Sequence, residues 1–159
     1  MLILGIDPGS QITGYGVIEK KSNNLRHLIH GEVKQRKGSL LSTVLNSIYR
    51  HLSDVIVENS PQAIALENIF YGKNVRSLIK QAHVRGVIIF AGASKGIPVF
   101  EYSPLEVKKA VVGYGRAEKT QVQIMVKAIL KLPSLPPPDA ADALAVAICH
   151  ANFLKEQEL

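Results

Sequence analysis

The chain has 159 residues, of which 47% are hydrophobic and 20% are charged. These values are close to the average for globular proteins, so they exclude a disordered chain and a fibrous architecture. The longest apolar runs, such as residues 86–93, are far shorter than the roughly 20 residues needed to cross a bilayer. We therefore expect a single domain over residues 1–159 that lies in the cytoplasm and has no membrane contact.

Charge and cysteine content narrow the choice of partners and compartment. The 19 Lys and Arg residues exceed the 13 Asp and Glu residues, which gives a net charge of +6. A polyanionic partner such as nucleic acid is therefore favoured, although charge alone does not identify one. The single cysteine, Cys149, cannot form an intramolecular disulfide or a multi-thiolate metal site, as expected for a reducing compartment.

The first third of the chain predicts three strands and a helix. Residues 2–7, 13–19 and 25–33 are the predicted strands, and the short linkers between them, 8–10 and 20–24, indicate antiparallel hairpins. From Leu40 onward, apolar residues recur at steps of three and four, which is typical of an amphipathic helix. We expect this helix to end near Glu58.

Strands and helices alternate in the rest of the chain. The short apolar run 63–66 ends at Glu67, as a buried parallel strand would. Ser103, Pro104 and Glu106 have the spacing of a capping box with proline in the first helical turn. The other predicted elements are a helix at 75–93, a strand at 98–102, and helices at 104–112, at 118–132 and from Asp139 onward. This order predicts an α/β fold with a five-stranded mixed sheet flanked by helices.

Four carboxylates stand out against the basic background. Asp7 and Glu67 each follow an apolar strand, and ligand sites gather at the carboxyl ends of neighbouring strands in α/β sheets. Asp139 and Asp142 are three residues apart at the start of the last predicted helix, so they share one helix face. If that helix packs near the same strand ends, all four carboxylates converge.

Each carboxylate also has a structural interpretation. Asp139 can be an N-cap and Asp142 a favourable first-turn charge, and on local grounds this is the more probable interpretation of the pair alone. Asp7 can brace the turn at Pro8, and Glu67 can form one ion pair. These interpretations leave unexplained why two apolar strands of a basic chain both end in acids.

Converging carboxylates repel one another unless they are protonated or bridged by cations. Mg²⁺ and Mn²⁺ are the hard ions that accept such an all-oxygen ligand set. Zinc is not indicated, because the five histidines and the single cysteine show no ligand spacing.

Several segments, in order and over nearly the whole chain, closely resemble the RuvC family of bacterial Holliday junction resolvases. They include Gly5-Ile6-Asp7-Pro8-Gly9-Ser10, Glu67-Asn68-Ile69-Phe70, Pro98-Val99-Phe100-Glu101-Tyr102 and Asp139-Ala140-Ala141-Asp142. The resemblance implies a ribonuclease H-like fold and a homodimer that cuts two opposing strands of a four-way DNA junction symmetrically. It also implies a branch-migration partner of the RuvA–RuvB type.

The resemblance further implies the site residues. Asp7, Glu67, Asp139 and Asp142 would be the catalytic acids, and some family members carry histidine in place of Asp139. Two Mg²⁺ ions per active site, for which Mn²⁺ can substitute, would lie about 3.5 to 4 Å apart, and the products would carry 5′ phosphate and 3′ hydroxyl ends. Lys119 would lie near the scissile phosphate, unless it is a solvated residue at a helix start.

DNA contacts are expected from basic residues that flank the acids. These residues are Lys73, Arg76, Lys80, Arg85, Lys108, Lys109, Arg116 and Lys119, and phosphate contacts are their expected use. Phe70 would stack as a wedge on an unpaired base at the crossover, the alternative being a core anchor. The helix at 75–93 would contribute to the dimer interface, unless its apolar residues are buried within the monomer.

Three other functions compete with the resolvase. A different nuclease on the same fold, either a ribonuclease H acting on hybrids or a resolvase-like nuclease of RNA processing, would share the acids. Activity on a four-way junction compared with activity on a hybrid duplex separates these from a resolvase. A sugar-kinase or actin-type ATPase can begin with a similar motif but needs two such domains. A catalytically dead junction-binding module would have lost acids that are all present here.

Overall fold

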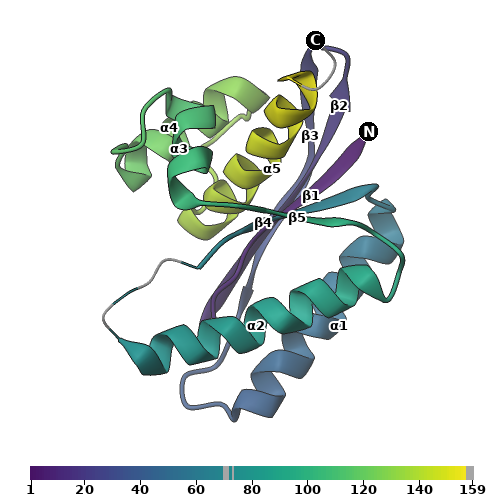
Figure 1. Cartoon of the computed structure of the whole chain (residues 1–159), viewed down its shortest axis with the longest axis vertical. Coiled ribbons are helices and arrows are strands. Elements are labelled where there is room, and N and C mark those ends of the chain that lie inside the picture. The colour runs from purple at the N-terminus through teal and green to yellow at the C-terminus, as the bar shows by residue number, and fades with distance from the viewer. Residues whose placement is uncertain (70–71, 73, 157–159) are drawn as a thin grey trace.

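The computed structural model describes residues 1–69, 72 and 74–156, and it contains a five-stranded sheet with helices on both faces (Figure 1). The strands are β1 (Leu2–Asp7), β2 (Ile12–Lys21), β3 (Asn24–Lys34), β4 (Ala63–Glu67) and β5 (Val99–Tyr102). Their order is β3-β2-β1-β4-β5, with antiparallel pairing from β1 to β3 and parallel pairing of β4 with β1 and β5. The predicted five-stranded mixed sheet is confirmed, and β1 is its central strand.

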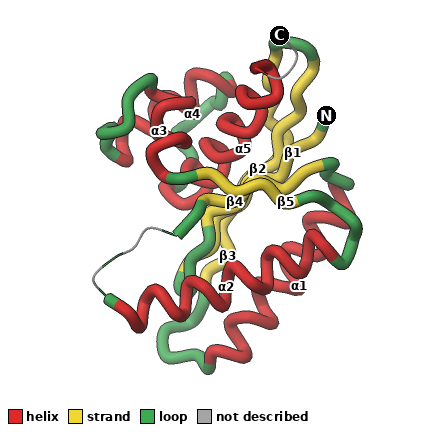
Figure 2. The backbone as a smooth tube through the Cα atoms, in the orientation of Figure 1, coloured by secondary structure: helices red, strands yellow, loops and turns green. Residues whose placement is uncertain are grey.

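Two layers of helices cover the sheet. Helices α1 (Leu41–Asn59) and α2 (Val75–Ala93) lie on one face, and α3 (Pro104–Val112), α4 (Lys119–Leu130) and α5 (Pro138–Glu156) lie on the other (Figure 2). Ser103 and Glu106 form the predicted capping box of α3. No helix in the described part of the chain is long and apolar enough to span a membrane.

Left-handed residues account for two boundaries that the sequence analysis misplaced. The predicted linker 20–24 is wrong, because β2 and β3 pair up to Lys21 and Asn24 and the turn contains Ser22 at φ 50°. The predicted helix at 118–132 ends at Leu130, because Lys131 takes a φ of 53°. Non-glycine residues seldom adopt this conformation, so sequence pattern gives little warning of it.

The alternation of side chains along β1 and β4 separates two cores. Leu4 and Ile6 of β1 belong to the core beneath α1 and α2, whereas Ile3 belongs to the core beneath α3, α4 and α5. Successive strand residues point to opposite faces, so Asp7 points to the α5 side. Ala65 lies in the α5-side core, and Glu67 two residues later points the same way.

Helix α5 lies directly on glycine backbone of the sheet. A Cβ atom added to Gly5 would lie 2.0 Å from the carbonyl oxygen of Ala143, and one added to Gly14 would lie 1.9 Å from that of Asp139. Only glycine permits this approach. Because Gly14 pairs with Asp7 across the β1–β2 ladder, the contact sets the first turn of α5 beside the end of β1.

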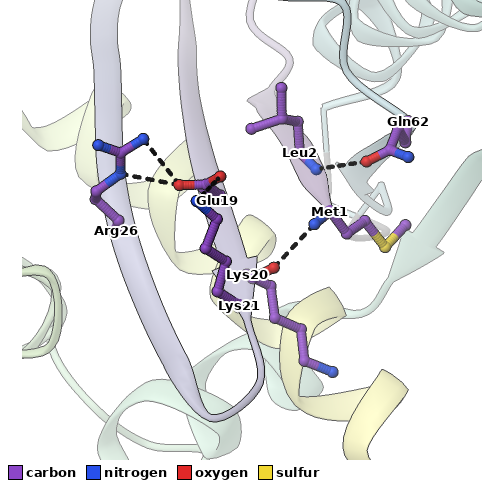
Figure 3. A network of polar contacts seen from close by, with 7 residues as sticks. All are labelled: Met1, Leu2, Glu19, Lys20, Lys21, Arg26 and Gln62. Carbon is purple, nitrogen blue, oxygen red and sulfur yellow. Dashed lines mark hydrogen bonds and ion pairs between the residues drawn. The ribbon is translucent and has the colours of Figure 1, made fainter.

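The other end of β1 is held from both sides (Figure 3). The Met1 amino group donates to the Lys20 carbonyl at 2.8 Å, and the Lys20 amide donates to the Met1 carbonyl at 2.8 Å. Toward β4, the Leu2 amide donates to Gln62 Oε1 at 3.0 Å. These bonds fix the register of β1 against its neighbours, and therefore the position of Asp7 at the end of the strand.

Candidate active site

Four carboxylates come together where β1 and β4 meet the N-terminus of α5. Asp7 and Glu67 are the last residues of parallel neighbours whose preceding residues, Ile6 and Leu66, are register partners. Asp139 and Asp142 lie in the first turns of α5. All four side chains are partly buried, so the structure brings the four predicted acids together.

Burial and mutual repulsion raise the pKa of three of these carboxylates, those of Asp7, Glu67 and Asp142. Burial, followed by the charges of Glu67, Asp142 and Asp139, raises the pKa of Asp7 to about 8. Burial, followed by the charge of Asp142, raises the pKa of Glu67 to about 7. Burial also raises the pKa of Asp142, against the opposing effect of Lys119. The four side chains therefore form one electrostatic unit that favours a proton or a cation.

Two lysines face this unit. Lys119, the first residue of α4, places its Nζ 3.7 Å from Asp142 Oδ2. Lys108 of α3 lowers the pKa of both Glu67 and Asp142. The sequence analysis expected Lys108 only as a phosphate contact. The capping box at Ser103 could have indicated that Lys108 lies near the carboxylates. It fixes the residue at which α3 begins, and therefore the direction in which Lys108 points.

The donor set suits a hard divalent cation. It consists of carboxylate oxygens, which Mg²⁺ and Mn²⁺ prefer, and its raised pKa values show charge that a cation would relieve. Within the described residues, no three His, Cys, Asp or Glu side chains are already grouped closely enough to hold a metal ion.

The residues expected to contact DNA differ in where the structure places them. Arg76, Lys80, Lys109 and Arg116 are exposed, while Lys73 and the predicted wedge Phe70 lie outside the described residues. Lys109 is not brought to the carboxylates, because it lines a hollow with Asn152, about 20 Å along α5 from Asp139.

Arg85 is less accessible than the other basic residues of this set. Its guanidinium lies 2.8 Å from Glu101 Oε1, and only 13% of its side chain is exposed. This ion pair joins α2 to β5, and the expected phosphate contact of Arg85 stays a prediction.

Two histidine contacts escaped the sequence analysis. His27 Nε2 lies 2.8 Å from His30 Nδ1, because an irregularity in the β2–β3 register at Val17/Ile18 puts both on one face of β3. His150 is buried, with its Nδ1 2.6 Å from the hydroxyl of Tyr102, which is the register partner of Glu67. A spacing of three predicts opposite faces of a regular strand, so the sequence gives no sign of the first contact.

The chain is similar in sequence to known proteins of one family. The family model for crossover junction endodeoxyribonuclease RuvC matches residues 3–150. The protein of that name from Syntrophotalea carbinolica is 53% identical, and the match covers 100% of this chain and 99% of the relative. The one from Geotalea uraniireducens is also 53% identical, and the match covers 96% of this chain and 89% of the relative.

Solved structures agree. Thermus thermophilus RuvC in complex with a Holliday junction substrate superposes with a TM-score of 0.93 at 33% identity, covering 99% of this chain and 96% of that one. A yeast mitochondrial Holliday junction resolvase shares the fold, with a TM-score of 0.71 at 12% identity over 98% of this chain and 80% of that one. The fold is therefore the ribonuclease H-like fold that the resemblance implied. The family model and the relatives together establish that the chain belongs to the RuvC family of crossover junction endodeoxyribonucleases.

Proposed function

We propose that this chain resolves Holliday junctions by hydrolysing one phosphodiester in each of two opposing strands at the carboxylates of Asp7, Glu67, Asp139 and Asp142. The observation that carries the proposal is the convergence of these four acids, with raised pKa values at Asp7 and Glu67, in a basic chain of the RuvC family. RuvC-family nucleases in general depend on divalent metals, and the carboxylate donor set of this chain suits such ions. The products would carry 5′ phosphate and 3′ hydroxyl ends.

The four carboxylates would hold two Mg²⁺ ions, or Mn²⁺ in their place. When bound, such a pair activates water on one side of a phosphodiester and stabilises the leaving oxygen on the other. Asp7 is close enough to all three other acids to feel their charges, since Glu67, Asp142 and Asp139 each raise its pKa. Asp7 would therefore take part in holding the ions together with Glu67 and with the α5 acids.

The lysines act on the phosphate. Lys119 is 73% exposed at its side chain although it is within 3.7 Å of Asp142, so its ammonium can turn from the carboxylate to a bound phosphate. There it would offset the negative charge that develops in the transition state. Lys108 would partly offset the negative charge of Glu67 and Asp142.

A homodimer would supply the two active sites. Ile79, His83, Gly86 and Phe90 form a stripe at helical spacing along α2, in which Ile79 is 52% exposed and Phe90 is 61% exposed. His83, Gly86 and Phe90 of this stripe also line a largely apolar groove of about 490 Å³ between α1 and α2. A second copy packed here by twofold symmetry would match the symmetry of the junction. A RuvA–RuvB-type complex would deliver the junction.

Phe70 remains a prediction as a wedge at the crossover. The variant Phe70→Ala should lose junction affinity by a factor of about ten, because base stacking is worth roughly 1–3 kcal/mol and is available only where pairing is broken. Affinity for plain duplex and the melting temperature should not change. Parallel losses on both substrates would instead identify Phe70 as a core anchor.

Nick mapping on a synthetic junction tests the proposed function. Strand-labelled four-way junctions, the matching linear duplex and an RNA–DNA hybrid are incubated with the protein and Mg²⁺ or EDTA. The expected result is two symmetric, ligatable nicks in opposing strands of the junction with Mg²⁺ only. Preferred cleavage of the hybrid, nicks scattered over all four arms, or cleavage in EDTA would overturn the proposal.

A further inference from the structure

We propose that Arg36, Lys37 and Lys80 form a phosphodiester-binding site that holds a duplex arm of the junction next to the scissile phosphate. We call these three residues the arm cluster. Arg36 and Lys37 lie in the loop between β3 and α1, and Lys80 lies on α2. The inference rests on the proposed function and adds to it residues that the sequence analysis left unassigned or placed only in a general basic surface.

The three cations line one hollow. It has a volume of about 240 Å³, and Ser10, Gln11 and Gln35 add polar groups to its wall. Among the described residues that line it there is no Asp or Glu. Cations and neutral hydrogen-bonding groups without an acid are what a phosphate oxygen requires.

The charges of the arm cluster are available. Arg36, Lys37 and Lys80 are exposed, and none of the ion pairs found among the described residues involves them. Lys34, which immediately precedes this loop, differs in this respect because its Nζ lies 3.2 Å from Glu32 Oε2. The positive charge of the hollow is therefore not neutralised within the monomer.

The loop that carries Arg36 and Lys37 is held in shape. The Gln35 amide donates to the Gln11 carbonyl at 2.8 Å, and Gln35 Nε2 donates to Ser47 Oγ at 3.2 Å. Ser39 Oγ donates to the Arg36 carbonyl at 2.7 Å, across Gly38 at a φ of 80°. Much of the ordering of this backbone is thus complete before a ligand binds, which lowers the cost of binding.

The arm cluster shares a turn with the catalytic carboxylates. Ser10 of the hollow is three residues after Asp7 in the β1–β2 turn, and Gln81 Nε2 of α2 donates to the Pro8 carbonyl of that turn at 3.3 Å. Lys108 of α3 and Lys119 of α4 come from the opposite face of the sheet to α2, and both lie near enough to Glu67 to lower its pKa. A DNA strand that crosses the carboxylates would therefore meet positive charge on both sides.

Equilibrium binding in EDTA tests the arm cluster without cleavage. The variants are Arg36→Gln/Lys37→Gln and Lys80→Gln, and the matched control is Lys95→Gln/Lys127→Gln, which removes two charges outside the hollow. Anisotropy of a labelled junction is measured at several salt concentrations. The double variant should bind on the order of tenfold more weakly, and its slope of log K against log salt should fall by about 0.9 for each phosphate that it no longer neutralises. The control should match the wild type.

Uncharged methylphosphonate linkages locate the contact. Placed along one arm a few nucleotides from the cleavage point, they should weaken binding by the wild type and leave binding by the Arg36→Gln/Lys37→Gln variant unchanged. Unchanged slope and affinity in the variants, or equal sensitivity of wild type and variant to the methylphosphonates, would overturn the inference. An equal effect in the control double variant would also overturn it.

The outcomes separate the arm cluster from the proposed function. If the wild type binds the junction with the expected variant effects but does not nick it, the proposed chemistry fails and the arm cluster stands. If it nicks symmetrically and the variants bind normally, the arm cluster fails and the proposed function stands.

Discussion

Asp7 has a high pKa because of where it is placed. It leaves the central strand under α5, where burial and three neighbouring acids all oppose its ionisation. Similar carboxylates on an open surface would be ionised at neutral pH and would bind a divalent ion only weakly. Ionising these buried acids therefore costs stability in the metal-free protein, and the proposed cations would offset that cost.

Replacing Asp7 with asparagine tests its proposed role. Asp7→Asn keeps the shape of the side chain and removes its charge, so junction cleavage should fall at least a hundredfold, as measured by single-turnover kinetics. Junction binding in EDTA should persist or tighten, because one charge that repels phosphate is gone. The control is Asp54→Asn, on an exposed position of α1, which should cleave normally. Residual cleavage within tenfold of the wild type would rule out Asp7 as an essential ligand.

The raised pKa values also predict how stability depends on pH. The pKa of Asp7 rises from 3.8 to about 8 and that of Glu67 from 4.5 to about 7. At pH values between the ordinary pKa and the raised pKa of these two groups, the folded, metal-free protein binds more protons than the unfolded chain. Its free energy of unfolding therefore falls as the pH rises. Thermal melts in EDTA should show a lower melting temperature at pH 8 than at pH 6, corresponding to about 1–3 kcal/mol.

Two comparisons make this prediction specific. Asp7→Asn should flatten the dependence, because the main titrating group is gone. Mg²⁺ should stabilise the wild type more at pH 8 than at pH 6, because it competes with protons for the same oxygens. A melting temperature that rises from pH 6 to pH 8 in EDTA would contradict the pKa assignment.

At the scale of elements, the contact between α5 and the sheet decides where two of the acids lie. Gly14→Ala would place a Cβ 1.9 Å from the carbonyl oxygen of Asp139, so the first turn of α5 must move. We expect a loss of about 1–3 kcal/mol in stability. Cleavage by the folded protein should fall by about a hundredfold, because small displacements of catalytic groups are costly.

A substitution at a second glycine serves as the control, because it lowers the stability of the protein without displacing α5. Gly96 has a φ of 69° and open space around it, so Gly96→Ala should lower stability by about 1–2 kcal/mol through backbone strain alone. Its cleavage at a temperature well below the melting transition should equal that of the wild type. Equal activity in Gly14→Ala and Gly96→Ala would show that the position of α5 does not matter for catalysis.

Sequence pattern predicted the elements well where local chemistry determines them. The capping box at Ser103 and the apolar run before Glu67 were sufficient to locate α3 and β4. The convergence of Asp7 and Glu67 followed from the same logic, since both end parallel strands. The Arg85–Glu101 ion pair and the His27–His30 contact were not predictable, because they depend on helix packing and on an irregular strand register.

At the scale of the whole molecule, the proposed dimer can be tested on α2. Ile79→Asp places a charge in the exposed apolar stripe, so the dimer should dissociate at least tenfold more readily in sedimentation equilibrium. Paired nicking should give way to single nicks, because each active site then acts alone. The control is Ile124→Asp on α4, where the isoleucine is 55% exposed and no contact is proposed. A wild-type chain that is monomeric at working concentrations and still makes paired nicks would contradict the dimer.

The contact of α5 with β1 and β2 also has a consequence for the newly made chain. A ribosome produces Asp7 and Glu67 long before Asp139 and Asp142, and the second pair is placed only when α5 settles on Gly5 and Gly14. A nascent or prematurely terminated chain that stops before α5 therefore lacks two of the four acids, and the face of the sheet that α5 covers is open. If the four acids act together as proposed, such a fragment would not cut DNA, and the activity would arise only when the last helix has been made.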